Sequence, residues 1–218
     1  MKKRKRKRKA PKAPKAAKPA KPKKVKKIKE VPQAPSGTFP LTYKQAQKIA
    51  DHTAPEQMRY ALNTIFVRGE KNKITMVATD GKRMCVVAVP AKSDKFEKMV
   101  SVDNFLNIAR GGNGFVKIES ILNAEAIEGT YPKFEDVVPK NVPNLMFRYC
   151  PQMQAVQVET GIGFNAAFVV DGSALVMEMF KDVDVVDFYG NKRENPFVAR
   201  YKRPNASVIV IVSPLSTR

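Results

Sequence analysis

The sequence predicts an α+β fold for residues 39–218 and a disordered basic arm before it. Three observations support this prediction. Positive charge is concentrated at one end, two stretches repeat apolar residues at helical spacing, and the other apolar runs alternate as strands between turn signals. Helices that are segregated from antiparallel meanders of strands are typical of the α+β class. The 218 residues suit one or two domains.

The N-terminal segment, residues 1–38, is a low-complexity run of Lys, Pro and Ala. It holds 17 of the 40 Lys and Arg residues and one acid, Glu30, which leaves residues 39–218 with a net charge of only +4. Its few apolar residues cannot offset the roughly 1–2 kcal/mol per residue that ordering costs. We therefore expect a disordered arm that binds polyanions through their phosphates, without sequence preference and with steep salt dependence.

The candidate nucleic-acid contacts of the arm are Lys2, Lys3, Arg4, Lys5, Arg6, Lys7, Arg8 and Lys9. Deleting residues 1–38 is expected to weaken duplex binding and to flatten its salt dependence. A solubilising tail and a nuclear address are the alternative interpretations of the same composition.

Composition argues against several classes of protein. The two cysteines, Cys85 and Cys150, lie in no CxxC pattern, and His52 is the single histidine, so a disulfide framework, a zinc site and most His-based catalysis are disfavoured. The acids Asp182, Asp184 and Asp187 alternate with valines, as in a half-exposed strand, and favour no metal site. No phosphate-binding glycine loop or hydrolase motif occurs. We expect no enzyme, no cofactor and no metal.

The first part of the body is predicted to contain helices at 42–54 and 103–110 and strands at 62–68, 73–78, 84–89 and 98–102. Ser101 or Asp103 is the expected N-cap of the second helix, and Gly111 its end. Further strands are expected at 115–120 and 123–129. This order indicates a coarse duplication of a βαβββ unit.

The second part begins with an expected hairpin of strands at 145–150 and 155–160. Residues 165–180 are predicted to be helical in places, with Gly172 as a weak point. Strands follow at 183–190, 195–201 and 206–214. The predicted divisions are an arm at 1–38, one domain at 39–140 and a shortened domain at 141–218.

Several stretches, in a shared order, resemble the bacterial DNA polymerase sliding clamp, the beta subunit of the replicative holoenzyme. MRYALN…ATDGKRMCVVAVP, residues 58–90, and VSVDNFLNIARGGNGFVKI, 100–118, are similar to its middle domain. EGTYPKFEDVVP, 128–139, resembles the closing strand of that domain. GIGFNAAFVV, 161–170, and VIVIVSPL, 208–215, resemble parts of the last domain.

The resemblance implies a reduced clamp of a phage, plasmid or other divergent replicon. Such a clamp is a homo-oligomeric ring with antiparallel sheets outside and helices lining a DNA channel. It is a processivity factor that holds duplex DNA without reading its sequence. The implied body contacts to DNA are Lys44, Lys48, Arg59, Tyr60 and Arg110. A cytoplasmic, nucleoid-associated location is expected, in the host cytoplasm if the gene is viral, and no membrane partner.

The resemblance also implies a pocket that accepts short peptides from the replicative polymerase and the clamp loader. The residues carried over by motif are Leu62, Thr79, Gly81, Lys82, Arg83, Met84, Ile211, Val212, Pro214 and Leu215. The apolar members offer a groove, and the flexible Met84 suits varied ligands. Lys82 replaces the usual His and Ser213 a Met. Taken alone, ATDGKRM is a plain turn between strands, and the alternative functions are a non-ring nucleic-acid-packaging protein and a replication adaptor.

Overall fold

The computed structural model describes residues 36–54, 60–140, 142, 144–151, 155–158, 164–190 and 195–214. The predicted basic arm therefore lies outside the described residues. All the described residues belong to a single compact unit. Among them, no helix is both long enough and apolar enough to cross a membrane.

The first part of the body forms the two predicted helices and the four strands predicted between 62 and 102, with shifted ends. Its elements are β1 (Thr38–Pro40), α1 (Tyr43–Ala50), η1 (Tyr60–Asn63), β2 (Thr64–Glu70), β3 (Lys73–Thr79), β4 (Arg83–Pro90), β5 (Phe96–Ser101), α2 (Val102–Gly111), β6 (Phe115–Lys117), α3 (Ile118–Asn123) and α4 (Phe134–Val137). Helix α1 begins at a capping box, because the Thr42 hydroxyl accepts from the Gln45 backbone N–H at 3.2 Å and the Gln45 side chain accepts from the Thr42 N–H at 2.9 Å. The predicted cap of α2 is confirmed, since the Ser101 side chain accepts from the Asn104 N–H.

The second part contributes β7 (Asn144–Cys150), β8 (Ala155–Val158), α5 (Ala166–Met179), β9 (Val186–Gly190), β10 (Phe197–Arg203) and β11 (Ala206–Val212). The predicted hairpin is confirmed, because β7 and β8 pair in antiparallel register. The strand predicted at 183–190 begins only at Val186, so Asp182 and Asp184 precede it.

One nine-stranded antiparallel sheet runs through both parts, in the order β5-β2-β3-β4-β11-β10-β9-β7-β8. Its central joint is the pairing of β4 with β11, in which Met84 lies opposite Ile211 and Arg83 opposite Val212. Residues more than a hundred positions apart in the chain therefore become neighbours at this joint. A second, two-stranded sheet pairs β1 with β6.

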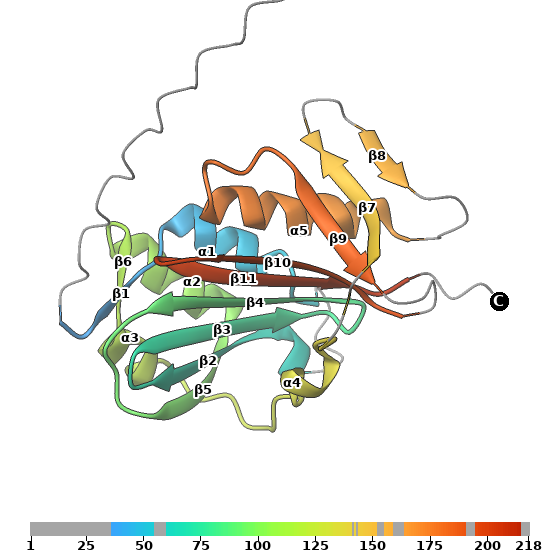
Figure 1. Ribbon diagram of the computed structural model, residues 1–218. Helices are drawn as coiled ribbons and strands as arrows, with labels where there is room; N and C mark the ends of the chain where they lie inside the picture. The colour runs from blue at the N-terminus through green and yellow to red at the C-terminus, as the bar shows by residue number, and fades with distance from the viewer. Residues whose placement is uncertain are drawn as a thin grey trace, which may run out of the picture. The chain divides into compact units, whose positions relative to one another are not determined.

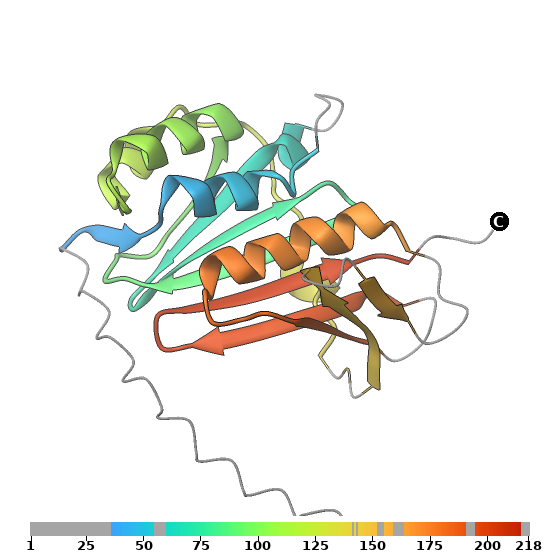
Figure 2. The same ribbon diagram turned by 90° about the horizontal axis from the view of Figure 1, so that it is seen from above.

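Strand alternation gives the large sheet two apolar faces. Ile65 and Val67 point to the face covered by α1, α2 and α5, which form the helix layer seen in Figure 2. Phe66, between them, points to the opposite face, called here the far face, where Tyr131 and Phe134 cover it. Figure 1 shows α4 on the other side of the sheet from α5.

Residues 165–180, predicted to be helical in places with Gly172 as a weak point, do form a helix, but Gly172 does not interrupt it. Helix α5 is continuous, and Gly172 is buried in it. A Cβ at Gly172 would lie 2.4 Å from Cγ1 of Val210, so glycine here lets the helix approach β11 closely. The residue that weakens the helix locally is thus required by its packing.

Three strand predictions between 115 and 139 also need correction. Only Phe115–Lys117 is a strand, and Ile118–Asn123 is a helix that buries Ile118 and Ile121, which are three residues apart. Residues 123–129 form no strand. Residues 128–139, which resemble a closing strand, contain the single helical turn α4 instead, and it places Phe134 on the far face.

Candidate functional site

The ATDGKRM stretch is a turn closed by its own side chains. The carboxylate of Asp80 accepts hydrogen bonds from the backbone N–H groups of Lys82, at 2.8 Å, and Arg83, at 2.9 Å. The Thr79 hydroxyl accepts from the Gly81 N–H at 3.1 Å and donates to the Arg83 carbonyl at 2.6 Å. Gly81 has a φ of +86°, which explains the glycine. The turn is therefore held rigid, with the Lys82 side chain exposed to solvent.

The guanidinium of Arg83 is bound inside the chain. It donates to the Asp80 carboxylate at 3.0 Å, to the Asp51 carbonyl at 2.6 Å and to the Asp171 carboxylate. It also lies over the Phe168 ring, 4.7 Å from the centroid. Since Asp51 caps α1 while Asp171 and Phe168 belong to α5, one side chain ties the turn to two helices.

His52 lies buried beside this cluster. Its Nδ1 is 3.0 Å from the Lys48 carbonyl, so Nδ1–H is the donor. Burial and the positive charge of Arg83 lower the pKa of His52 to about 4, against the opposing effect of that hydrogen bond. His52 is therefore neutral at pH 7 and acts as part of the core.

The two walls of the predicted peptide pocket meet at the joint of β4 and β11. Met84 and Ile211 are cross-strand partners on the far face, with exposed fractions of 4% and 2%. The Ser213 N–H donates to the Lys82 carbonyl at 2.9 Å, which fixes the end of β11 against the turn. The arrangement places an exposed cation, Lys82, next to a buried apolar pair.

The remaining predicted pocket residues are spread around this joint. Leu62 is nearly buried, and its Cδ1 would lie 3.7 Å from a Cβ on Gly81. Val212 is fully buried and points to the helix layer, away from Met84. Pro214 forms a bridge with Phe164, and Leu215 lies outside the described residues.

A further wall of the joint was not predicted from the sequence. Val138 and Val142 pack against the far-face cluster that contains Met84 and Ile211. Arg200 donates a hydrogen bond to the Pro139 carbonyl between them and holds this segment on the sheet. The only signal in the sequence is a pair of valines four residues apart, which is too weak to predict such a contact.

The predicted DNA contacts that are described lie on the helix layer. Lys44 and Lys48 share one face of α1, as their spacing predicts. Each forms an ion pair, Lys44 Nζ with the Glu178 carboxylate at 3.5 Å and Lys48 Nζ with the Asp51 carboxylate at 2.9 Å. Arg110, at the end of α2, lies 4.9 Å over the Tyr43 ring and donates to its hydroxyl. The helix layer thus presents cations that carboxylates partly neutralise.

The side chains of the other predicted DNA contacts lie outside the described part of the structure. Lys2, Lys3, Arg4, Lys5, Arg6, Lys7, Arg8, Lys9 and Arg59 lie outside the described residues. Tyr60 begins η1, but its side chain is outside the described part of the structure.

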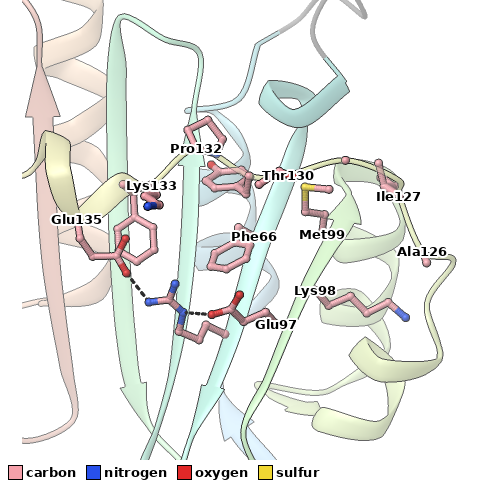
Figure 3. A pocket seen from close by; sticks show the side chains of 14 residues that line it. Phe66, Glu97, Lys98, Met99, Ala126, Ile127, Thr130, Pro132, Lys133 and Glu135 are labelled. Carbon is pink, nitrogen blue, oxygen red and sulfur yellow. Dashed lines mark hydrogen bonds and ion pairs between the residues drawn. The ribbon is translucent and has the colours of Figure 1, made fainter.

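A pocket of about 590 Å³ lies on the far face beside β2 and β5. Figure 3 shows Phe66, Glu97 and Glu135 in its lining. The guanidinium of Arg68 forms ion pairs with Glu97, at 2.8 Å, and with Glu135. Tyr131 stacks on Phe66 with ring centroids 5.0 Å apart. Because Arg68 pairs with both carboxylates and Tyr131 stacks on Phe66, these groups already have partners within the chain, and we interpret this pocket as structural. Strand β2, which lines it, is two strands away from β4 in the sheet order.

Neither a protein-family model nor a curated protein sequence matches this chain. Solved structures do. A DNA polymerase sliding clamp from Pseudomonas aeruginosa matches with a TM-score of 0.58 and 16% identity, over 86% of this chain and 69% of that one. A protein described as a DNA polymerase III beta subunit from Eubacterium rectale matches with a TM-score of 0.62 and 15% identity, over 87% and 68%.

A third example is the DNA polymerase III beta chain of Streptococcus pneumoniae, with a TM-score of 0.59 and 14% identity over 89% of this chain and 68% of that one. The predicted α+β sliding-clamp fold is therefore confirmed. The chain has the fold of the bacterial DNA polymerase sliding clamps, in a form that is divergent in sequence and spans about two thirds of their length.

Proposed function

We propose that this chain is a sliding-clamp processivity factor, which encircles duplex DNA and tethers replication proteins. The observation that carries the proposal is the fold, which matches clamps along almost the whole described body. Its layered arrangement also suits the task, because a continuous sheet supports α1, α2 and α5 on one face. Clamps act by topology and binding, so the proposed role is not enzymatic.

A ring requires surfaces that join one copy to the next. Strands β5 and β8 are the two ends of the nine-stranded sheet, and each has one partner strand among the described residues. Such edges can pair with another chain. Pairing of β5 in one copy with β8 in the next is a heterologous contact, which closes into a ring when the rotation fits. We propose a homo-oligomer, with three copies as the expected number if each supplies two of six domains.

DNA binding in this proposal uses charge without reading bases. Lys44, Lys48 and Arg110 offer phosphate contacts on the helix layer, and such contacts position a protein without specifying sequence. Because Lys44 and Lys48 have carboxylate neighbours, the helix layer alone contributes a weak field. The basic arm supplies much of the proposed affinity for duplex DNA.

Partner binding is proposed at the joint of β4 and β11. The apolar pair Met84 and Ile211 would receive an apolar side chain of a short peptide, and Lys82 its carboxylate or carbonyl. Val138 and Val142 pack against the cluster that contains this pair, so in this proposal a peptide binds by displacing or sliding beneath that segment. Replicative polymerase and clamp loader are the proposed partners.

The peptide site is tested by Lys82→Glu. We expect at least a tenfold loss of affinity for a peptide from the C-terminus of a bacterial replicative polymerase, because an attractive charge becomes repulsive. Lys202→Glu, an equal charge change at an exposed lysine at the opposite end of β10 and β11 from Ile211, is the matched control and should change affinity less than twofold. Equal affinities for the two variants, measured by fluorescence anisotropy, would remove Lys82 from the site.

The whole proposal is tested by the mass of the 24.3 kDa chain in solution together with its behaviour on DNA. A homo-oligomer that remains on closed circles is expected. A monomer that compacts DNA would favour a packaging protein, and a monomer that binds only peptides would favour an adaptor.

A further inference from the structure

A hollow of about 920 Å³ lies at the end of the body where the described chain begins. Four segments far apart in the sequence form it: residues 36–38, the turn between β2 and β3, the link between β4 and β5, and the junction of β6 with α3. Figure 1 shows β1, β6 and α3 at the same end of the sheet as the turn between β2 and β3. This hollow is separate from the β4–β11 joint.

Lysines from each of the last three segments surround this hollow. Lys71, Lys92, Lys95 and Lys117 are all exposed, and Asp94 and Glu119 are the carboxylates beside them. No described carboxylate lies within ion-pairing distance of any of the four lysines, whereas Lys73, two residues from Lys71, pairs with Glu70 at 3.0 Å. The lining therefore carries two more positive charges than negative ones, and these four cations have no described internal counter-ion.

The backbone around the hollow holds these lysines at fixed separations. The Ala91 N–H donates to the Asn72 carbonyl at 3.2 Å, which joins the link to the β2–β3 turn. The Ile118 N–H donates to the Gly37 carbonyl at 2.9 Å, and Thr38 is the register partner of Lys117. A Cβ on Gly69 would lie 2.3 Å from the Phe96 ring, so β2 and β5 are packed tightly here.

The chemistry of this lining fits phosphate groups. Lysines act as flexible point charges, which attract phosphates without the planar fork that arginine uses to read a base edge. Ser36, Asn72 and Ser93 add short polar side chains at the same surface. The lining has one aromatic ring, Phe96, which packs against Gly69 of β2, so four lysines and one packed ring suit a phosphate backbone more than exposed bases.

We propose that this lysine hollow binds the phosphate backbone of duplex DNA, as a second contact apart from the helix layer. The choice of DNA rests on the proposed function, while the preference for phosphate rests on the lining alone. The lysine-rich arm directly precedes Ser36, which is one of the residues that line the hollow. The hollow would bind a duplex without sequence preference.

The test compares two variants of the full chain. In one, Lys71, Lys92, Lys95 and Lys117 are changed to Gln, and in the matched control Lys133, Lys140, Lys181 and Lys202 are changed to Gln, so that both lose four charges. Affinity for a 30-base-pair duplex is measured at several salt concentrations. The slope of log affinity against log salt is negative. For every phosphate that the protein no longer neutralises, its magnitude should decrease by about 0.9.

We expect the magnitude of this slope to decrease by about 2 to 3 units for the hollow variant and by less than about 1 for the control. The circular dichroism of both variants should be unchanged. Equal slopes for the two variants would overturn the inference. Retention on circular DNA is measured in parallel, and it reports the proposed function separately. A hollow variant with a reduced slope that still stays on circles supports both proposals, and a reduced slope with no retention by any variant supports the hollow alone.

Discussion

At the scale of single residues, Arg83 shows how a motif can conceal a structural role. The sequence suggests that it faces a peptide, but its guanidinium is engaged by Asp80, Asp171 and the Asp51 carbonyl. Asp171 is 88 residues away in the chain, so no local pattern could reveal this contact. Arg83 can still position Lys82 for a partner, because it holds the turn that carries Lys82.

Replacing Arg83 by Met should destabilise the fold. The change leaves Asp80, whose side chain is 12% exposed, without its cation, and it unties the turn from α1 and α5. The loss of charged hydrogen bonds and an uncompensated carboxylate together cost about 2–4 kcal/mol. Urea unfolding should show this as a lower midpoint.

The control for Arg83 is Arg203→Met. Arg203 pairs with Asp182 at 3.4 Å, and the two side chains are 49% and 71% exposed, so the expected loss is within about 1 kcal/mol. If Arg83→Met lowered the free energy of unfolding no more than Arg203→Met does, the stability of the turn would not depend on the contacts of Arg83.

His52 makes stability depend on acid. Its pKa falls from 6.5 to about 4 on folding, so the unfolded chain binds more protons between these values. Stability from this group is full above about pH 6.5 and is lost as the pH falls toward 4. Between pH 7 and pH 4 the wild-type protein should lose about 3 kcal/mol more than His52→Gln, which cannot titrate.

Urea unfolding at pH 7 and at pH 4 measures this difference directly. Comparing the two proteins removes the shared contribution of carboxylates that titrate in the same range. If the stability of the wild-type protein and of the variant depended on pH in the same way, His52 would be solvated and its pKa would not be lowered by folding.

At the scale of elements, close packing against β11 determines which residue α5 can hold at position 172. Gly172→Ala normally favours a helix by up to about 1 kcal/mol, but here the new Cβ would lie 2.4 Å from Val210 Cγ1. Forcing a methyl group into a packed core costs about 1–3 kcal/mol, so we expect a net lower melting temperature.

Gly111→Ala is the matched control, because a Cβ there meets nothing within 4 Å. It should be neutral or slightly stabilising. Adding Val210→Ala to Gly172→Ala should recover part of the loss, since it removes the obstructing methyl groups. An increase in melting temperature for Gly172→Ala alone would contradict the close approach of α5 to β11.

Elements with a regular period could be predicted from the sequence, and those shaped by distant contacts could not. Helices α1 and α2 and strands β2, β3 and β4 follow their apolar patterns and caps. Residues 118–139 lack a clear period, and their helical turns form because Ile121 and Phe134 pack against other parts of the body. Such packing is invisible to a local pattern.

At the scale of the whole molecule, the main feature missing from the sequence analysis is the pairing of β4 with β11. It joins the two parts into one sheet and brings together the two predicted walls of the pocket. The resemblance to clamps indicated both walls, but the far-face cover by Val138 and Val142 follows only from the three-dimensional arrangement. The lysine hollow likewise depends on four segments that the fold alone assembles.

The most direct test of the account is retention on circular and linear DNA. The protein is assembled on a nicked circular plasmid and passed through a sizing column at about 0.3 M salt, where charge contacts to phosphate are weak. The amount retained is compared with that on the same plasmid cut once by a restriction enzyme. A topological clamp stays on the circle and slides off the cut ends, so we predict at least tenfold greater retention on the circle. Equal loss from both forms would contradict the proposal that this chain encircles DNA.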